Sequence, residues 1–170
     1  FAHYEVSGGV ATRFYFFGGQ RVAMRKGNTL TYLHTDHLGS TVLTTGGSGN
    51  TTQLYYAYGR LRWGGGLPTD RTFTGQQQDG SGLIYMNARY YLPEIGRFIS
   101  PDTIVPDPGN PQSYNRYAFG YNNPVKYSDP SGHTPWDVID AIFFGISAYQ
   151  FATNPTWGNA GWLAVDAVSL

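Results

Sequence analysis

Turn signals recur about every 8 to 12 residues through the first half of the chain. Gly18-Gly19, Gly27-Asn28 and the stretch 46–50 (GGSGN) separate short runs rich in Tyr, Phe, Val and Thr. Glycine adopts the positive φ angles of tight turns at little steric cost, and the intervening runs have the length of strands. The spacing predicts a mainly β fold of antiparallel hairpins up to about residue 99, with no long helix between residues 10 and 90.

Aromatic residues occur next to one another within these expected strands. Residues 14–17 read FYFF, and Tyr55-Tyr56 and Tyr90-Tyr91 are further pairs. Because successive side chains of a strand point to opposite faces, both faces must carry rings. This pattern is unusual for a small sandwich with one polar face, and it suits a large sheet that wraps an enclosed space.

Residues 100–132 differ from the part before them, since six of the ten prolines fall here. Proline removes a donor from the sheet ladder, so this segment is not expected to be central sheet. Its aromatic content is too high for a disordered tract. We expect an ordered, inward-packed segment held by Ile104, Tyr114, Tyr117, Phe119, Tyr121 and Tyr127.

The pattern changes again after the sequence Asp129-Pro130-Ser131-Gly132. Asp before Pro favours an extended entry, and Gly132 can take a positive φ that redirects the chain. Thr134-Pro135 then matches the residue preferences of a helix N-terminus, with Thr as N-cap and Pro at the first helical position. The sequence therefore predicts a turn at 129–132, a helix from Thr134 and a second helix from about residue 156.

Composition excludes several classes of function. Lys and Arg total 11, as do Asp and Glu, so no basic surface for nucleic acid is expected. There is no Cys, which excludes disulfides and thiolate sites. The most apolar stretch, about 138–151, is too short and too polar to span a membrane. The first residues show no signal peptide, and the last stop within a helical pattern, so we expect a piece of a longer polypeptide.

Three stretches resemble one family. Residues 32–45 (YLHTDHLGSTVLTT), 71–103 (RTFTGQQQDGSGLIYMNARYYLPEIGRFISPDT) and 115–133 (NRYAFGYNNPVKYSDPSGH) resemble the core domain associated with Rhs, or YD, repeats. The resemblance implies a shell built from a spiral of β-hairpins, an end segment that closes it, and a variable C-terminal region that is often a toxin. The implied organisation is a β-strip at 1–99, a Pro-rich plug at 100–132 and a pre-toxin or linker segment at 133–170.

The resemblance also implies a function, with partners and a location. The chain would close a shell that encapsulates and presents a C-terminal effector of a secreted or cell-surface bacterial protein. Its partner would be the remainder of the same polypeptide, with a secretion apparatus or surface complex. No cofactor, no metal and no nucleic acid are expected. The alternative is a cell-surface or complex-associated β-domain that reuses the fold for binding, without toxin cargo.

Several relatives of this kind cut themselves at the junction with two aspartates, which implies a site here. Asp102 matches the first position, whereas the second falls nearest Ala118, which is not an acid. Asp107 could replace it, because two close carboxylates separate their pKa values. Both acids also suit ordinary turns beside proline. The junction would comprise Asp129, Pro130, Gly132 and His133, where Leu is usual in place of His. We expect weak or absent cleavage after Gly132.

Two further patterns have alternative interpretations. His34 and His37 flank Asp36, but residues three apart at a strand end point to different faces, so a polar turn is favoured over a metal site. A set of Arg and Tyr residues could stack on sugars or bases. The alternative is packing within the shell, with Arg on rings or paired with Asp. The set comprises Arg89, Tyr90, Tyr91, Arg97, Arg116 and Tyr117.

Overall fold

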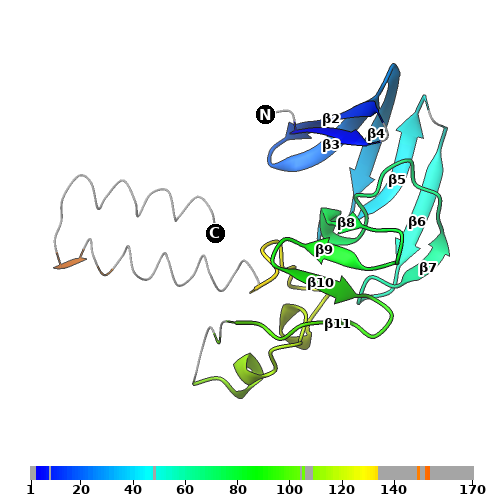
Figure 1. Cartoon of the computed structure of the whole chain (residues 1–170). Helices are drawn as coiled ribbons and strands as arrows, with labels where there is room; N and C mark the ends of the chain where they lie inside the picture. Colours follow the sequence, from blue (N-terminus) through cyan, green and yellow to red (C-terminus); the bar gives the residue numbers. More distant parts are fainter. Residues whose placement is uncertain are drawn as a thin grey trace.

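The computed structural model describes residues 3–7, 9–47, 49–103, 105, 109–133, 149 and 152–153. Seven antiparallel strands have the same order in the sheet as in the chain, which makes a continuous meander (Figure 1). They are β1 (His3–Ser7), β2 (Val10–Phe17), β3 (Gln20–Lys26), β4 (Thr29–Thr35), β5 (Thr41–Gly46), β6 (Thr51–Tyr55) and β7 (Leu61–Gly64). The predicted mainly β fold is confirmed.

A second, smaller antiparallel sheet follows. Its strands lie in the order β11-β10-β9-β8. They are β8 (Gln77–Gln78), β9 (Ile84–Met86), β10 (Arg89–Leu92) and β11 (Arg97–Phe98), with the short 3-10 helices η1 (Phe73–Gly75), η2 (Pro111–Tyr114) and η3 (Gly120–Asn122) around them. In Figure 1 this sheet lies below the ends of β5 and β6, and the segment after β11 passes beneath it.

Turn chemistry sets the hairpins where the sequence predicts them. Gly18 and Gly19 have φ of +55° and +76° and connect β2 to β3 through a two-residue loop. Between β4 and β5, Oδ1 of Asp36 accepts hydrogen bonds from the amides of Leu38 (2.9 Å) and Ser40 (2.8 Å). These local bonds fix the register of neighbouring strands, so the meander follows from short-range signals.

Two hydrophobic clusters hold the described chain together. Phe14, Met24 and Leu33 form one beneath β2–β4. The other joins the two sheets and comprises Phe73, Ile84, Met86, Tyr91, Phe98 and Phe119, with Tyr55 and Tyr58 packed against it. Phe119 is fully buried and its ring centre lies 4.8 Å from that of Tyr91. The segment after residue 100 is therefore anchored to the body through this ring.

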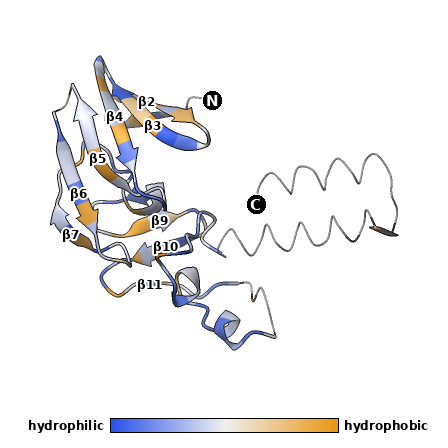
Figure 2. Cartoon of the chain, turned by 180° about the vertical axis from the view of Figure 1, so that it is seen from behind, coloured by the Kyte–Doolittle hydropathy of each residue, from blue (hydrophilic) through white to orange (hydrophobic). Residues whose placement is uncertain are grey.

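The other aromatic anchors expected in the Pro-rich segment are less buried than predicted. Tyr114 is 60 % exposed and Tyr117 is 43 % exposed. Figure 2, coloured by hydropathy, shows apolar stretches on β4, β6 and β9. Their phenol rings can remain in water because the hydroxyl is polar. Ile104 lies outside the described residues.

The β-strip carries rings on both faces, as predicted. Phe14 of β2 is buried, whereas the neighbouring Tyr15 is 36 % exposed and Phe17 is 82 % exposed. Residues 71–75 lie within the region predicted to form hairpins, but they make a bridge at Arg71 followed by η1 rather than a strand. Thr74 within η1 has φ of +49°, a conformation that a sequence pattern does not reveal for a β-branched residue.

The helices predicted from Thr134 and from about residue 156 lie outside the described residues. Residues 149, 152 and 153, which the structure does describe, are helical. Within the described part of the chain, no helix is both long enough and apolar enough to cross a membrane.

Candidate functional site

Three buried charged side chains meet where the small sheet receives the junction. Arg89 is the first residue of β10, and its Nη2 lies 2.8 Å from Oδ2 of Asp102 and 3.4 Å from Oδ2 of Asp129. The side chains are 5 %, 5 % and 2 % exposed. The guanidinium also lies over the Phe98 ring, 3.6 Å from its centre. One buried cation thus holds two buried carboxylates side by side, which we call the Arg89 cluster.

Asp129 forms the junction turn with its own side chain. Its Oδ1 accepts hydrogen bonds from the amides of Gly132 (2.8 Å) and His133 (3.0 Å) and from Oγ of Ser131 (3.3 Å). The positive φ predicted for Gly132 is present, at +76°. This is the usual reason for Asp at the start of a turn, but here the same carboxylate also faces Arg89.

The turn is docked on the loop that connects β9 to β10. The amide of Ala88 donates to the carbonyl of Ser131 at 3.2 Å, and the side chains of Asn87 and Gln76 donate to the carbonyl of Pro130. Nε of Arg89 donates to the carbonyl of Gly132. A Cβ at residue 132 would overlap a backbone oxygen at the start of this loop. Only glycine therefore permits this approach.

His133 completes the cluster. Its Nδ1 lies 2.9 Å from Oδ1 of Asp102, and its carbonyl accepts from Nη2 of Arg89 at 3.4 Å. The His133 side chain is 33 % exposed, whereas that of Asp102 is 5 % exposed. Each oxygen of the Asp102 carboxylate thus has a separate partner, the guanidinium on one side and the imidazole on the other.

Burial shifts the pKa values of two members of the cluster in opposite directions. Burial raises the pKa of Asp129 to about 6, although the Arg89 cation and the amides of Gly132 and His133 oppose the rise. Burial also lowers the pKa of Arg89, with Asp102 and Asp129 opposing it. Asp129 can therefore carry a proton at mildly acid pH while Asp102 pairs with the guanidinium. Two carboxylates whose environments differ in this way can take acid and base roles.

The second buried carboxylate at Arg89, beside Asp102, is Asp129, which the sequence pattern assigns to the junction turn. Ala118, the position that the resemblance gives for a second aspartate, bridges to Arg97. Asp107 lies outside the described residues.

Arg89 packs within the protein, as in the second of the two interpretations of the Arg and Tyr set, and does not offer its guanidinium to a sugar or a base. Its guanidinium stacks on Phe98 and pairs with the two aspartates. Arg116 has a related role, since its Nε donates to the backbone carbonyl of Asp102. The signal that could have located the cluster is the pair of Asp residues beside proline, which need a cation once buried.

The histidines of the HTDH motif do not come together at a site. Nε2 of His34 contacts Oγ1 of Thr45 at 3.0 Å, whereas Nε2 of His37 contacts the carbonyl of Val125 at 2.9 Å. Among the residues that the structure describes, no group of three His, Asp or Glu side chains is placed to hold a metal ion.

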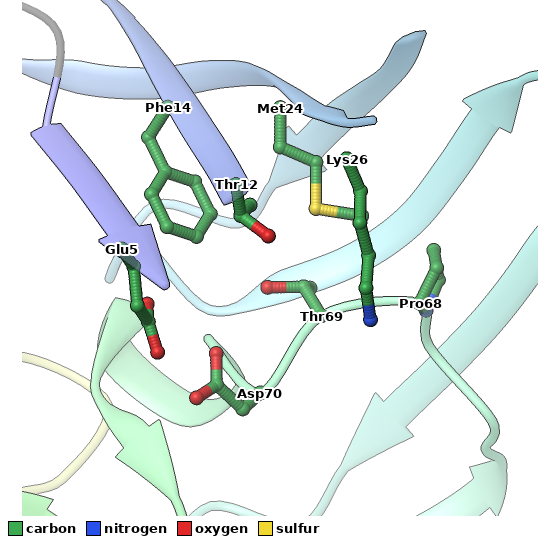
Figure 3. Close-up of a pocket in the computed structure, with 8 residues that line it drawn as sticks. All are labelled: Glu5, Thr12, Phe14, Met24, Lys26, Pro68, Thr69 and Asp70. Carbon is green, nitrogen blue, oxygen red and sulfur yellow. The ribbon is translucent and has the colours of Figure 1, made fainter. Parts of the chain in front are cut away.

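A separate cavity of about 190 Å³ lies between β1–β3 and the loop before η1 (Figure 3). Figure 3 shows the carboxylates of Glu5 and Asp70 next to each other at one end of it. Both are paired with Arg71, at 3.0 and 3.6 Å. These charges therefore stabilise the contact between the strip and the loop. The cavity is lined by Glu5, Thr12, Phe14, Met24, Lys26, Pro68, Thr69 and Asp70.

No family model matches the chain. The tRNA3(Ser)-specific nuclease WapA of Bacillus spizizenii is 32 % identical over 168 residues, which cover 91 % of this chain and 7 % of the nuclease. The toxin protein Tse5 of Pseudomonas aeruginosa is 36 % identical over 138 residues, or 72 % of this chain and 9 % of the toxin. Among solved structures, TcdB2-TccC3 without its hypervariable C-terminal region superimposes with a TM-score of 0.60.

The match to TcdB2-TccC3 has 26 % identity and covers 72 % of this chain and 6 % of that one. The chain thus spans less than a tenth of the length of each of these three proteins. All three are toxin proteins of the Rhs type, and this chain is related to a short segment of them.

Proposed function

We propose that the chain is the end module of an Rhs shell, which closes the shell and presents a C-terminal effector. The observation that carries this proposal is the junction turn, which is docked on the small sheet by backbone and side-chain bonds and is centred on the Arg89 cluster. A turn anchored in this way fixes where the β-body ends and where the following region begins.

We further propose that the Arg89 cluster hydrolyses the Gly132–His133 peptide bond. This replaces the expectation of weak or absent cleavage, which assumed that Ala118 leaves the site without a second acid, because Asp129 lies at Arg89 beside Asp102. Three groups around that bond are in suitable places. Nε of Arg89 donates to the Gly132 carbonyl oxygen, where negative charge would develop. Oδ1 of Asp129 lies 3.0 Å from the His133 nitrogen, which is the leaving group. Asp102 contacts the same guanidinium as Asp129. It is the second carboxylate of the cluster, and we assign it the role of activating water.

The chemistry balances with water as the only co-reactant. Asp102 removes a proton from water, whose oxygen attacks the Gly132 carbonyl carbon, and Arg89 stabilises the resulting oxyanion. The nitrogen of His133 then takes a proton from Asp129 as the C–N bond breaks. The products are a carboxylate on Gly132 and an amine on His133. The raised pKa of Asp129, about 6, suits the acid role.

The partner implied is the rest of the same polypeptide, with the shell before the chain and the effector after it. The effectors of the relatives, such as a tRNA nuclease, are properties of those proteins. Relationship to secreted toxins supports a secreted or cell-surface location for this one.

The test is size-exclusion chromatography of the purified full-length protein, followed by denaturing mass analysis of the shell peak. We expect a fragment beginning at His133 that elutes with the shell and resists added protease. A C-terminal region that is digested at once, or that elutes alone, would contradict encapsulation and favour a binding domain without cargo. A cut after His133 instead would move the reacting bond by one residue, because that carbonyl also accepts from Arg89.

A further inference from the structure

His133 contributes a side chain to the cluster that would cut its own peptide bond. We propose that its imidazole is a brake on that reaction: it occupies Oδ1 of Asp102 and keeps water from the carboxylate. A brake of this kind requires the proposed self-cleavage, on which the inference therefore rests.

Both oxygens of the Asp102 carboxylate are occupied. Its Oδ2 lies 2.8 Å from Nη2 of Arg89 and its Oδ1 lies 2.9 Å from Nδ1 of His133. A carboxylate acts as base only if a water molecule reaches one of its oxygens in hydrogen-bond geometry. Arg89 has to stay in place, because it also contacts Asp129 and donates to the Gly132 carbonyl. The imidazole is therefore the partner that can leave without exposing an unpaired buried charge.

The His133 ring is more exposed than the carboxylate that it contacts. The Asp102 side chain is 5 % exposed and that of His133 is 33 % exposed, so the imidazole lies on the outer side of the carboxylate. Rotation of the ring outward would open Oδ1 to water without moving the docked turn, which is held through backbone atoms of Ser131 and Gly132.

Three charged groups of the described residues contact His133. They are Asp102 through the imidazole, Arg89 through the carbonyl and Asp129 through the amide. Of these contacts only the one to Asp102 is made by the side chain, so a substitution of His133 can remove it and leave the two backbone contacts in place.

The experiment compares His133→Leu with His133→Asn in the full-length protein, by the rate at which the intact mass converts to fragments. Leucine fills the same space without a donor, whereas the Asn amide can donate from about the position of Nδ1. We expect His133→Leu to cleave roughly 10- to 100-fold faster than wild type, the range for a hydrogen bond to a charged group. We expect His133→Asn to stay as slow as wild type.

The outcomes separate the brake from the proposed function. If wild type and His133→Leu cleave equally, or the leucine variant is slower, the brake is disproved while self-cleavage stands. If none of the variants cleaves, both are disproved. Asp129→Asn combined with His133→Leu must lose the fast reaction, because cleavage that persists there would not belong to the Arg89 cluster.

Discussion

Nδ1 of His133 lies 2.9 Å from Oδ1 of Asp102, so the residue that follows the junction turn contacts a carboxylate at the start of the Pro-rich segment. The contact closes a loop of chain over the small sheet. Both residues are therefore tied to the small sheet while the cluster is intact. The same contact places the start of the following region at a defined point.

The Pro-rich segment should depend on one aromatic anchor. Phe119 is fully buried, with its ring centre 4.8 Å from that of Tyr91 and 5.7 Å from that of Phe73. Phe119→Ala should lower the free energy of unfolding by about 3–5 kcal/mol, the cost of removing a buried ring. Urea denaturation measures it, with Phe17→Ala as control because Phe17 is 82 % exposed. Equal effects of the two changes would contradict the anchoring role.

Gly132 should be irreplaceable for a steric reason rather than for its φ alone. A Cβ there would overlap the Met86 carbonyl oxygen, whereas Gly66 has the same φ, +76°, with no atom of the described residues within 4 Å of such a Cβ. Gly132→Ala should cost about 3 kcal/mol or more, and Gly66→Ala about 1–2 kcal/mol from the backbone alone.

Thermal or urea unfolding compares the stability of the two alanine variants, and hydrogen exchange measures the protection of single amides near the turn. The Ala88 amide donates to Ser131, so it should exchange faster in Gly132→Ala only. An equal loss of stability in both variants, with Ala88 still protected, would show that the turn tolerates a side chain.

The hairpins, which depend on neighbouring residues, could be predicted from the sequence. The candidate site could be predicted only in part. Hairpins follow from glycines such as Gly18 and Gly19, because the turn and the strands it joins are neighbours in the chain. The second carboxylate could not be located by position, because Arg89 brings Asp102 and Asp129 together from separate segments. Whether Asp129 is only a turn residue or also lies beside Asp102 depends on that buried cation, and only the folded chain brings the three side chains together.

Asp129 should make stability depend on pH. The ordinary pKa of an aspartate is 3.8, whereas that of Asp129 in the folded chain is about 6, so the folded state binds the proton more tightly. Protonated Asp129 therefore adds to the free energy of unfolding. This stabilisation is fully present below pH about 3.8 and is lost as the pH rises through about 6, and its upper limit is about 3 kcal/mol. The loss of unfolding free energy across this range should therefore be smaller in Asp129→Asn than in wild type, as measured by urea titration at each pH. An identical slope in both proteins would exclude this role for Asp129.

The most direct test of self-cleavage is the intact mass of the purified full-length protein, followed over time for wild type, Asp102→Asn and Asp129→Asn. Asp79→Asn serves as control, because the bonds of that carboxylate to the described residues lie within its own turn. Hydrolysis by the Arg89 cluster predicts fragments that end at Gly132 and begin at His133 in wild type and Asp79→Asn, and an intact chain in the other two variants. Cleavage that survives Asp129→Asn but not Asp102→Asn would contradict the pairing of these two carboxylates.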